Sequence, residues 1–180
     1  GLEKEIKLNI EANHATLSGH SFEHEIAYSI ANNALGSLDI NRGDTLLGWD
    51  TDQFPNNPGE LLMAFYHIYS NGGFKQGGLN FDAKIRRQST DPEDLFYAHI
   101  GGMDIAARCL IAVEKMINDS ELQNYINKRY KDWDSNLGSL INDKKNDLEL
   151  ISKQIIDKNI EPEPRSGNQE LLENVLNKYL

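Results

Sequence analysis

Basic residues are scarce in this sequence, and their scarcity excludes several classes of partner. The 180 residues include 18 Lys and Arg against 28 Asp and Glu, which gives a formal net charge of −10. A general nucleic-acid-binding protein would carry a basic patch, and anionic membrane surfaces attract clusters of basic residues. We therefore expect no nucleic acid and no membrane as partners, whereas the acidic balance fits a protein that attracts cations.

Cysteine and long apolar runs are also scarce. Cys109 is the single cysteine, so an intrachain disulfide is impossible, and its place in a helical pattern is typical of a small core residue. We find no apolar run long enough to span a bilayer and no secretory signal, so the default expectation is a reducing, cytoplasmic compartment. The chain begins at Gly1 without a methionine, which we interpret as the continuation of a longer polypeptide.

Short apolar runs alternate with helical patterns over the first two thirds of the chain. The predicted strands are 7–11, 37–41 and 78–82, and the predicted helices are 22–34, 61–69 and 91–118. Residues 12–19, 42–58 and 84–90 are predicted loops, and Gly36 is expected to end the first helix. Such alternation predicts an α/β fold with parallel strands joined by helical crossovers.

Strand patterns are not found after Asp119. The remaining chain reads as helical pieces at 121–131, 135–143, 148–159 and 169–179. These pieces are amphipathic but carry little apolar surface, so we expect an arm that packs on something else. The predicted division is therefore 1–118 and 119–180.

The segment Gly48–Phe54 carries Asp50 and Asp52 between two aromatic residues, Trp49 and Phe54. Two carboxylates this close repel each other, and burying them is costly unless a cation lies between them. A divalent cation satisfies that need, because hard oxygen ligands prefer it. The alternative is a solvated Asp-rich turn. The two aromatics, which we expect to be buried, argue against disorder in the long loop.

Four further residues lie at or just after the ends of predicted strands. Glu11, Asp39 and Asp82 each end a strand, and His14 follows Glu11 in the next loop. In repeated βα folds the carboxyl ends of the strands gather on one face. Each residue also has a simpler explanation, such as a helix cap or a hydrogen-bonded core histidine. Together with Asp50 and Asp52 they predict a two-metal site for Mg²⁺, Mn²⁺ or Co²⁺.

Several motifs closely resemble xylose isomerase in its longer, class II form. They are Asn9–Leu17, Gly19–Glu25, Asp39–Asp44, Gly48–Phe54, Leu79–Lys84, Asp91–Phe96 and Ser166–Glu170. The resemblance covers nearly the whole chain. It implies the last three βα units of a TIM (β/α)8 barrel, over 1–118, followed by a C-terminal helical extension arm for subunit contacts, over 119–180. It also implies a homotetramer held through that arm.

The resemblance implies a role for each candidate residue. Glu11 matches the carboxylate shared by both metals, Asp39 and Asp82 match ligands of the first metal, and His14, Asp50 and Asp52 match ligands of the second. Asp52 also matches the catalytic group that takes up a hydroxyl proton, and Lys84 matches a lysine beside the metal carboxylates, with an electrostatic role. The implied reaction converts D-xylose to D-xylulose, and D-glucose to D-fructose, by a metal-assisted 1,2-hydride shift without an organic cofactor.

The chain also departs from the family pattern. An eight-stranded barrel has five more strands, and the remaining ligand of the first metal and parts of the sugar pocket match positions before Gly1. We therefore expect the active enzyme to include an N-terminal barrel part, and the isolated chain to be inactive. Two alternatives remain: a non-catalytic fragment or assembly module acting through the helical arm, and another two-metal barrel, either a different sugar isomerase or an endonuclease.

Overall fold

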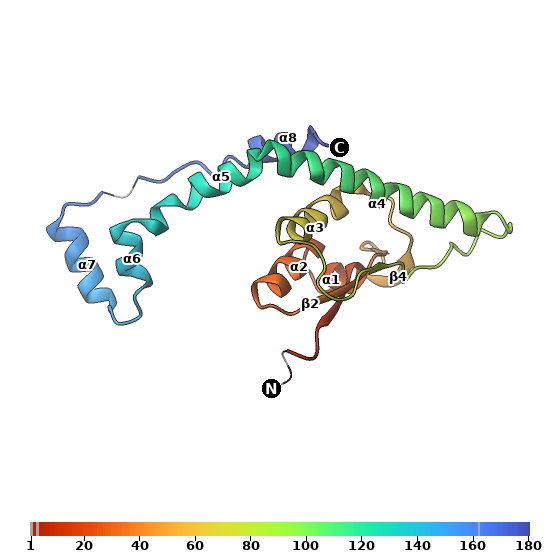
Figure 1. Ribbon diagram of the computed structural model, residues 1–180, viewed down its shortest axis with the longest axis horizontal. Helices are drawn as coiled ribbons and strands as arrows, with labels where there is room; N and C mark the ends of the chain where they lie inside the picture. Colours follow the sequence, from red (N-terminus) through yellow and green to blue (C-terminus); the bar gives the residue numbers. More distant parts are fainter. Residues whose placement is uncertain (1, 3, 162) are drawn as a thin grey trace. The chain divides into compact units, whose positions relative to one another are not determined.

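The computed structural model describes residue 2, residues 4–161 and residues 163–180 (Figure 1). The contacts of the chain divide it into two compact units. The first unit is Gly1–Asn118 with Tyr179–Leu180, and the second is Asp119–Lys178.

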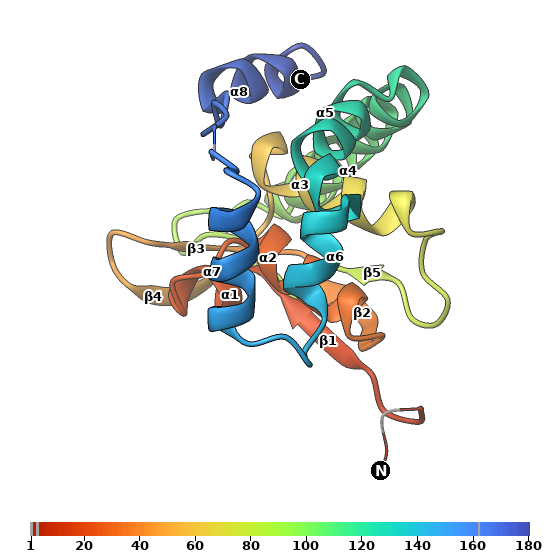
Figure 2. The same cartoon turned by 90° about the vertical axis from the view of Figure 1, so that its left-hand side faces the viewer.

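The centre of the first unit is a three-stranded parallel sheet. Its strands are β1 (Leu8–Glu11), β2 (Leu35–Asp39) and β5 (Leu79–Asn80), in the order β1-β2-β5 (Figure 2). The register places Glu11 beside Asp39 and Asp39 beside Asn80. The predicted α/β class with parallel strands is therefore confirmed, and the acidic ends of β1 and β2 lie at one edge.

Two helices, α2 (Phe22–Ala31) and α3 (Pro58–Ser70), pack side by side, and α3 contributes more buried apolar residues to the core than any other element (Figure 1). Each starts at a capping residue. Ser21 Oγ accepts a hydrogen bond from the His24 backbone N–H at 3.2 Å, and Asn57 Oδ1 accepts one from Gly59 at 3.0 Å. Ile26, Phe65 and Leu38 of β2 are fully buried. Burying each of these side chains contributes about 1.5–3 kcal/mol.

Helix α4 (Asp94–Asp119) buries one stripe of its surface and exposes another. Cys109, Val113 and Met116 are buried, and the Cys109 thiol donates to the Pro58 carbonyl at 3.4 Å. Contrary to the sequence-based expectation, α4 is long and apolar enough to cross a membrane by length and composition alone. One such helix is weak support for a membrane span, and the contact between Cys109 and Pro58 shows that one stripe of α4 packs on the first turn of α3. Its exposed face carries Phe96 and Tyr97.

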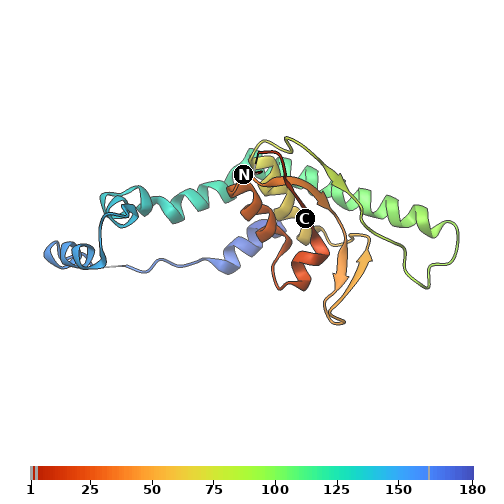
Figure 3. The same ribbon diagram turned by 90° about the horizontal axis from the view of Figure 1, so that it is seen from below.

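Two segments predicted as loops have regular structure. Residues 12–17 form α1 (Ala12–Leu17), which buries Ala12, Asn13 and Ala15 and satisfies the hydroxyl of Thr16 on its own backbone. The long loop contains an antiparallel hairpin of β3 (Arg42–Asp44) and β4 (Trp49–Gln53), seen as the paired orange strands in Figure 3. The prediction failed at the hairpin because Asp is disfavoured in strands, so Asp50 and Asp52 concealed β4. The turn signals were Asp44 and Gly48.

The boundary between α2 and β2 also differs from the prediction. The helix ends at Ala31, and Gly36 lies inside β2 instead of ending the helix. A Cβ atom on Gly36 would lie 2.8 Å from the Leu8 carbonyl oxygen, so the close approach of β1 requires glycine here. The tertiary contact, not a helix cap, explains this glycine.

The second unit is entirely helical over the residues described. It contains α5 (Glu121–Tyr130), the 3₁₀ helix η1 (Lys131–Asp134), α6 (Asn136–Asn142), α7 (Leu148–Asp157) and α8 (Gln169–Asn177). Polar contacts connect its later part to α5: Tyr125 Oη donates to the Gly167 carbonyl at 2.6 Å, and Lys178 pairs with Glu121 at 2.6 Å. Few apolar side chains are buried here, among them Leu122 and Val175.

Candidate metal centre

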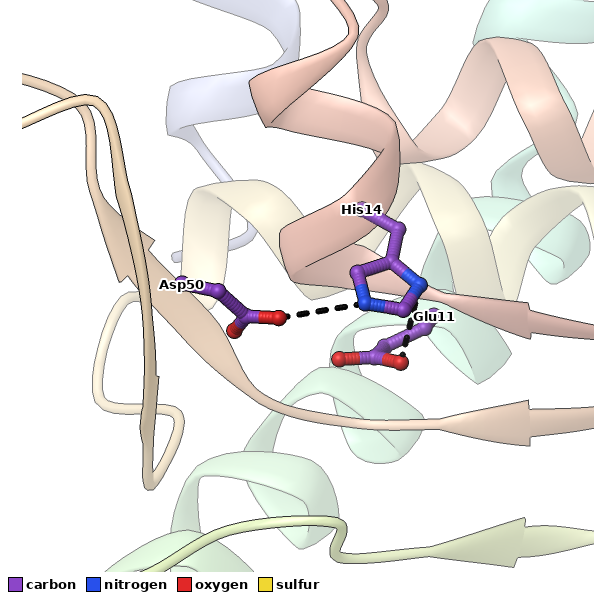
Figure 4. A group of neighbouring side chains, drawn as sticks. All are labelled: Glu11, His14 and Asp50. Atoms are coloured by element: carbon purple, nitrogen blue, oxygen red, sulfur yellow. Dashed lines mark hydrogen bonds and ion pairs between the residues drawn. The ribbon is translucent and has the colours of Figure 1, made fainter.

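A first group of ligand atoms comes from Glu11, His14 and Asp50, and these atoms lie within 4.8 Å of one another. Figure 4 shows the His14 ring between the two carboxylates. His14 Nδ1 lies 3.1 Å from Glu11 Oε2, and His14 Nε2 lies 3.1 Å from Asp50 Oδ2. Helix α1 produces this geometry, because residues three apart share a helix face and the first turn brings His14 back over Glu11. The β3–β4 hairpin then brings Asp50 to the same place.

A second group consists of Glu11, Asp39 and Asp82, whose ligand atoms also lie within 4.8 Å of one another. Glu11 ends β1 and Asp39 ends β2, and the parallel register sets the two residues side by side. Asp82 follows β5 by two residues. Glu11 is therefore common to both groups, and the sheet edge supplies three carboxylates from three neighbouring strands.

Asp52 belongs to neither of these two groups. Its Oδ2 accepts from Lys84 Nζ at 2.8 Å, and its backbone has φ of +41°, an uncommon conformation for a non-glycine residue. A hydrogen bond with Asp50 lowers the pKa of Asp52, and Lys84 lowers it further. The structure thus places Asp52 next to Asp50, with the predicted lysine beside it. The ligand and proton-transfer roles of Asp52 stay predictions.

The electrostatics of the cluster favour a cation. Desolvation raises the pKa of Glu11, and the charges of Asp50 and Asp82 raise it further, although Asn41 and His14 oppose the shift. The hydrogen bond with Asp52 raises the pKa of Asp50, because two carboxylates share a proton more readily than they share a negative charge. A divalent cation would relieve this repulsion without a proton.

Four asparagine side chains hold the acids, and the sequence analysis did not find them. Asn9 Nδ2 donates to Asp39 Oδ2 at 2.5 Å, and Asn80 donates to Asp39 Oδ1. Asn13, which is fully buried, donates to Asp50. The fourth is Asn41, which contacts Glu11.

A spacing signal for three of these asparagines was present in the sequence. Asn9 precedes Glu11 by two residues, Asn41 follows Asp39 by two, and Asn80 precedes Asp82 by two. Residues two apart on a strand share a face. An asparagine two positions from a strand-end acid could therefore have been predicted to reach the same edge of the sheet.

The aromatic residues that flank the two aspartates behave differently from each other. Trp49, expected to be buried, is 69% exposed, because it opens β4 opposite Asp44 at the solvent end of the hairpin. Phe54 does pack: its ring centroid lies 5.5 Å from that of Phe81 and 4.6 Å from that of His99. The prediction of a packing role was thus wrong for Trp49 and right for Phe54.

The space beside the cluster opens past the hairpin. A cavity of about 590 Å³ is lined by Trp49, Asp50 and Thr51 of β4 and by Lys84 and Arg86 of the loop after β5. Its lining includes one candidate ligand, Asp50. The shared carboxylate Glu11 lies at the carboxyl edge of the sheet instead. A substrate pocket centred on both groups would need walls beyond these residues.

The donor set fits divalent metal ions that prefer oxygen. Two groups of carboxylate and imidazole atoms share one carboxylate, and four asparagine amides orient the acids. Mg²⁺ and Mn²⁺ favour carboxylate ligands, and Co²⁺ also accepts imidazole. Glu11, Asp39 and Asp82 would hold one ion, and Glu11, His14 and Asp50 the other.

Fold and cluster together define an α/β protein with a candidate metal centre at the ends of its parallel strands. A family model described as XylA2 C-terminal domain matches residues 126–180. Over all 180 residues the chain is 55% identical to a xylose isomerase of Mesorhizobium japonicum, 57% to one of Yersinia pestis and 56% to one of Histophilus somni. The chain spans 41% of the length of each of these relatives.

Over its whole length the chain is similar to these xylose isomerases, and it matches their C-terminal part. The family resemblance predicted from the motifs is thereby confirmed. The family model matches residues of the second unit, whereas the candidate ligands lie in the first unit. The identity to the relatives extends over both.

Proposed function

We propose that this chain supplies the C-terminal part of a xylose isomerase, which converts D-xylose to D-xylulose and D-glucose to D-fructose. The observation that carries the proposal is the sharing of Glu11 between two groups of metal-ligating atoms. The names of the relatives, at 55–57% identity over the whole chain, support the same reaction. The proposed cofactors are two divalent metal ions, Mg²⁺, Mn²⁺ or Co²⁺, with no organic cofactor.

Held by Glu11, His14, Asp39, Asp50 and Asp82, two divalent ions would supply stabilisation of negative charge on the sugar oxygens for a 1,2-hydride shift. The residues of this chain orient the groups and take up a proton. Asp52 accepts the proton of a sugar hydroxyl, and Lys84 holds its carboxylate in place at 2.8 Å. The hydrogen bond with Asp50 and the contact with Lys84 lower the pKa of Asp52, so Asp52 is ionised at neutral pH and can accept a proton, although the same shift makes it a weaker base.

We further propose that the first unit is the last three βα units of a (β/α)8 barrel. Strands β1 and β5 are the outer strands of the sheet, so each has one edge available for further strands. Apolar side chains such as Phe96, Tyr97 and Ile100 of α4 are at least half exposed. Exposed apolar surface of this kind indicates an interface. An N-terminal barrel part would cover the open edge and complete the sugar pocket.

The second unit is proposed to be the arm that joins subunits of a homotetramer. Its helices expose Leu148, Ile156 and Leu171, which is unfavourable in water without a partner. The cytoplasm is the proposed location, because the single cysteine is buried and needs no oxidising compartment.

The test is an assay of xylose–xylulose conversion by the chain assembled with its N-terminal part, with Mg²⁺, Mn²⁺ or Co²⁺ and with a chelator. We expect turnover that the chelator abolishes. Asp52→Asn should abolish turnover and leave metal binding by the Glu11–Asp39–Asp82 group largely intact. Loss of that binding in Asp52→Asn would contradict the role assigned to Asp52. Absence of turnover in the unchanged assembly would contradict the proposed function.

The second candidate function is a non-catalytic assembly module acting through the second unit. The match of residues 126–180 to a separately defined C-terminal domain favours it. Calorimetric titration with Mn²⁺, in the presence and absence of the N-terminal part, separates the two functions. The isomerase requires tight binding when both parts are present, whereas an assembly module requires subunit association without metal.

A further inference from the structure

Asn41 is a polar side chain in a place usually filled by apolar ones. It lies two residues beyond Asp39 and is 1% exposed. Three hydrogen bonds satisfy its amide. Oδ1 accepts from the Asn13 backbone N–H at 2.9 Å, and Nδ2 donates to Glu11 Oε1 at 2.7 Å and to the Asp82 carbonyl oxygen at 2.9 Å. Both amide protons and the carbonyl oxygen therefore have partners, as a buried amide requires.

These three bonds connect the segments that carry the candidate ligands. Asn13 lies in the first turn of α1 next to His14, Glu11 ends β1, and Asp82 follows β5. Asn41 itself follows β2 directly after Asp39 and Ile40. One amide thus contacts every segment that supplies a ligand at the sheet edge.

The two oxygens of Glu11 have different partners because of this contact. Oε1 accepts from Asn41, and Oε2 lies 3.1 Å from His14 Nδ1. A glutamate side chain has three rotatable bonds, and holding it in one rotamer costs up to about 2 kcal/mol of conformational entropy. A buried donor that fixes Oε1 lets the folded protein meet that cost before any ion binds.

We propose that Asn41 is a positioning residue that holds Glu11 in the orientation shared by both groups of ligands. This inference rests on the proposed function, because it requires that Glu11 bind metal ions. Asn41 would not touch an ion or the sugar. It would act through Glu11, in the way that hydrogen-bond partners of metal ligands tune affinity elsewhere.

Asn80 provides a comparison at the same edge of the sheet, although it is exposed where Asn41 is buried. Like Asn41, it donates an amide N–H to a candidate ligand, but its partner is Asp39, which belongs to one group only. A change at Asn41 should therefore weaken the binding of both ions, and a change at Asn80 should weaken the binding of one. Because Asn41 is buried and Asn80 is exposed, the stability of each metal-free variant must be measured beside its metal affinity.

The experiment compares Asn41→Leu and Asn80→Leu in the chain assembled with its N-terminal part. Leucine has a similar size and removes the hydrogen bonds. Co²⁺ binding is measured by calorimetry and by visible absorption, which reports the ligand geometry of each ion. We expect Asn41→Leu to lower the affinity for both ions by about 10–100-fold. Asn80→Leu should lower the affinity for one ion by the same factor. Thermal unfolding in chelator measures the metal-free stability of each variant.

Each outcome decides the matter. A lower thermal midpoint in chelator with unchanged affinity for both ions would overturn the positioning role and leave Asn41 a structural residue. A lower affinity for only one ion in Asn41→Leu would also overturn the positioning role. If Asn41→Leu does not fold, Asn41→Ser replaces it, because serine places a smaller hydroxyl at the same position. Asn41→Ser must then lower the affinity for both ions. An unchanged protein that binds no Co²⁺ would refute the proposed function instead.

Discussion

Two adjacent glycines of α4 provide a sharp test of the packing behind the candidate centre. Gly101 is exposed, and a Cβ atom there would meet nothing within 4 Å. Gly102 is buried, and its Cβ would lie 3.0 Å from Phe81 Cζ and 3.4 Å from Phe54 Cδ1. These two rings adjoin Asp82 and the Asp52 segment, so the contact bears on the site.

The expected magnitudes follow from the two environments. Replacing a glycine inside a helix by alanine stabilises the helix by about 0.5–1 kcal/mol, and this gain applies to both positions. Overpacking against Phe81 costs about 1–3 kcal/mol at Gly102 alone. Gly101→Ala should therefore stabilise the protein, and Gly102→Ala should fall about 1–3 kcal/mol below it in free energy of unfolding.

Urea denaturation of the assembled protein measures the difference as a shift in midpoint at unchanged slope. Because Phe81 precedes Asp82, Gly102→Ala should also weaken binding of Co²⁺ by the Glu11–Asp39–Asp82 group, whereas Gly101→Ala should not. Equal stabilisation by both substitutions would refute the packing of α4 on Phe81. If the two variants were equally stable but Gly102→Ala altered Co²⁺ binding, the overpacking cost assigned to Gly102 would be refuted.

Three further predictions concern the rest of the first unit. Burial raises the pKa of Cys109 to about 11, so we expect slow iodoacetamide labelling of the folded protein by mass spectrometry, rapid labelling in urea, and a stability that declines as the pH rises from about 9 towards 11. Burial lowers the pKa of His67 below its usual 6.5, opposed by Glu23, so the unfolded state binds more protons there; the thermal midpoint should fall as the pH drops through about 6.5, and less so in His67→Gln. The isolated chain should aggregate, because β1 and β5 leave open edges, and it should lack xylose turnover, because the N-terminal barrel part is missing. A monodisperse, active monomer would contradict both expectations.

Spacing along the sequence was enough to predict the α/β class and the strand-end acids. The residues Glu11, Asp39 and Asp82 follow apolar runs, and parallel strands necessarily bring their carboxyl ends to one edge. Two helix starts also carry local signals, Ser21 at α2 and Pro58 at α3, although the predicted helix 61–69 begins three residues after α3 does. These features depend on neighbours a few residues away, so a single sequence contains them.

Other features could not be read from neighbouring residues. The β3–β4 hairpin places Asp50 against His14, although Asp and Thr have no strong strand pattern. Helix α1 is six residues long, too short for periodicity to reveal, and it depends on burial of Ala12 and Ala15. The exposure of Trp49 follows from its place at the end of the hairpin.

The sequence by itself therefore determined the candidate ligands and which family the chain resembles, because residue type and spacing are properties of the chain alone. The resemblance implied that Glu11 is shared, but only the tertiary structure brought its atoms within 4.8 Å of both groups of ligand atoms and placed Asn41 against it. The physical reason is distance along the chain. Asn41 and Glu11 lie 30 residues apart, and their 2.7 Å contact exists only once β1 and β2 have paired.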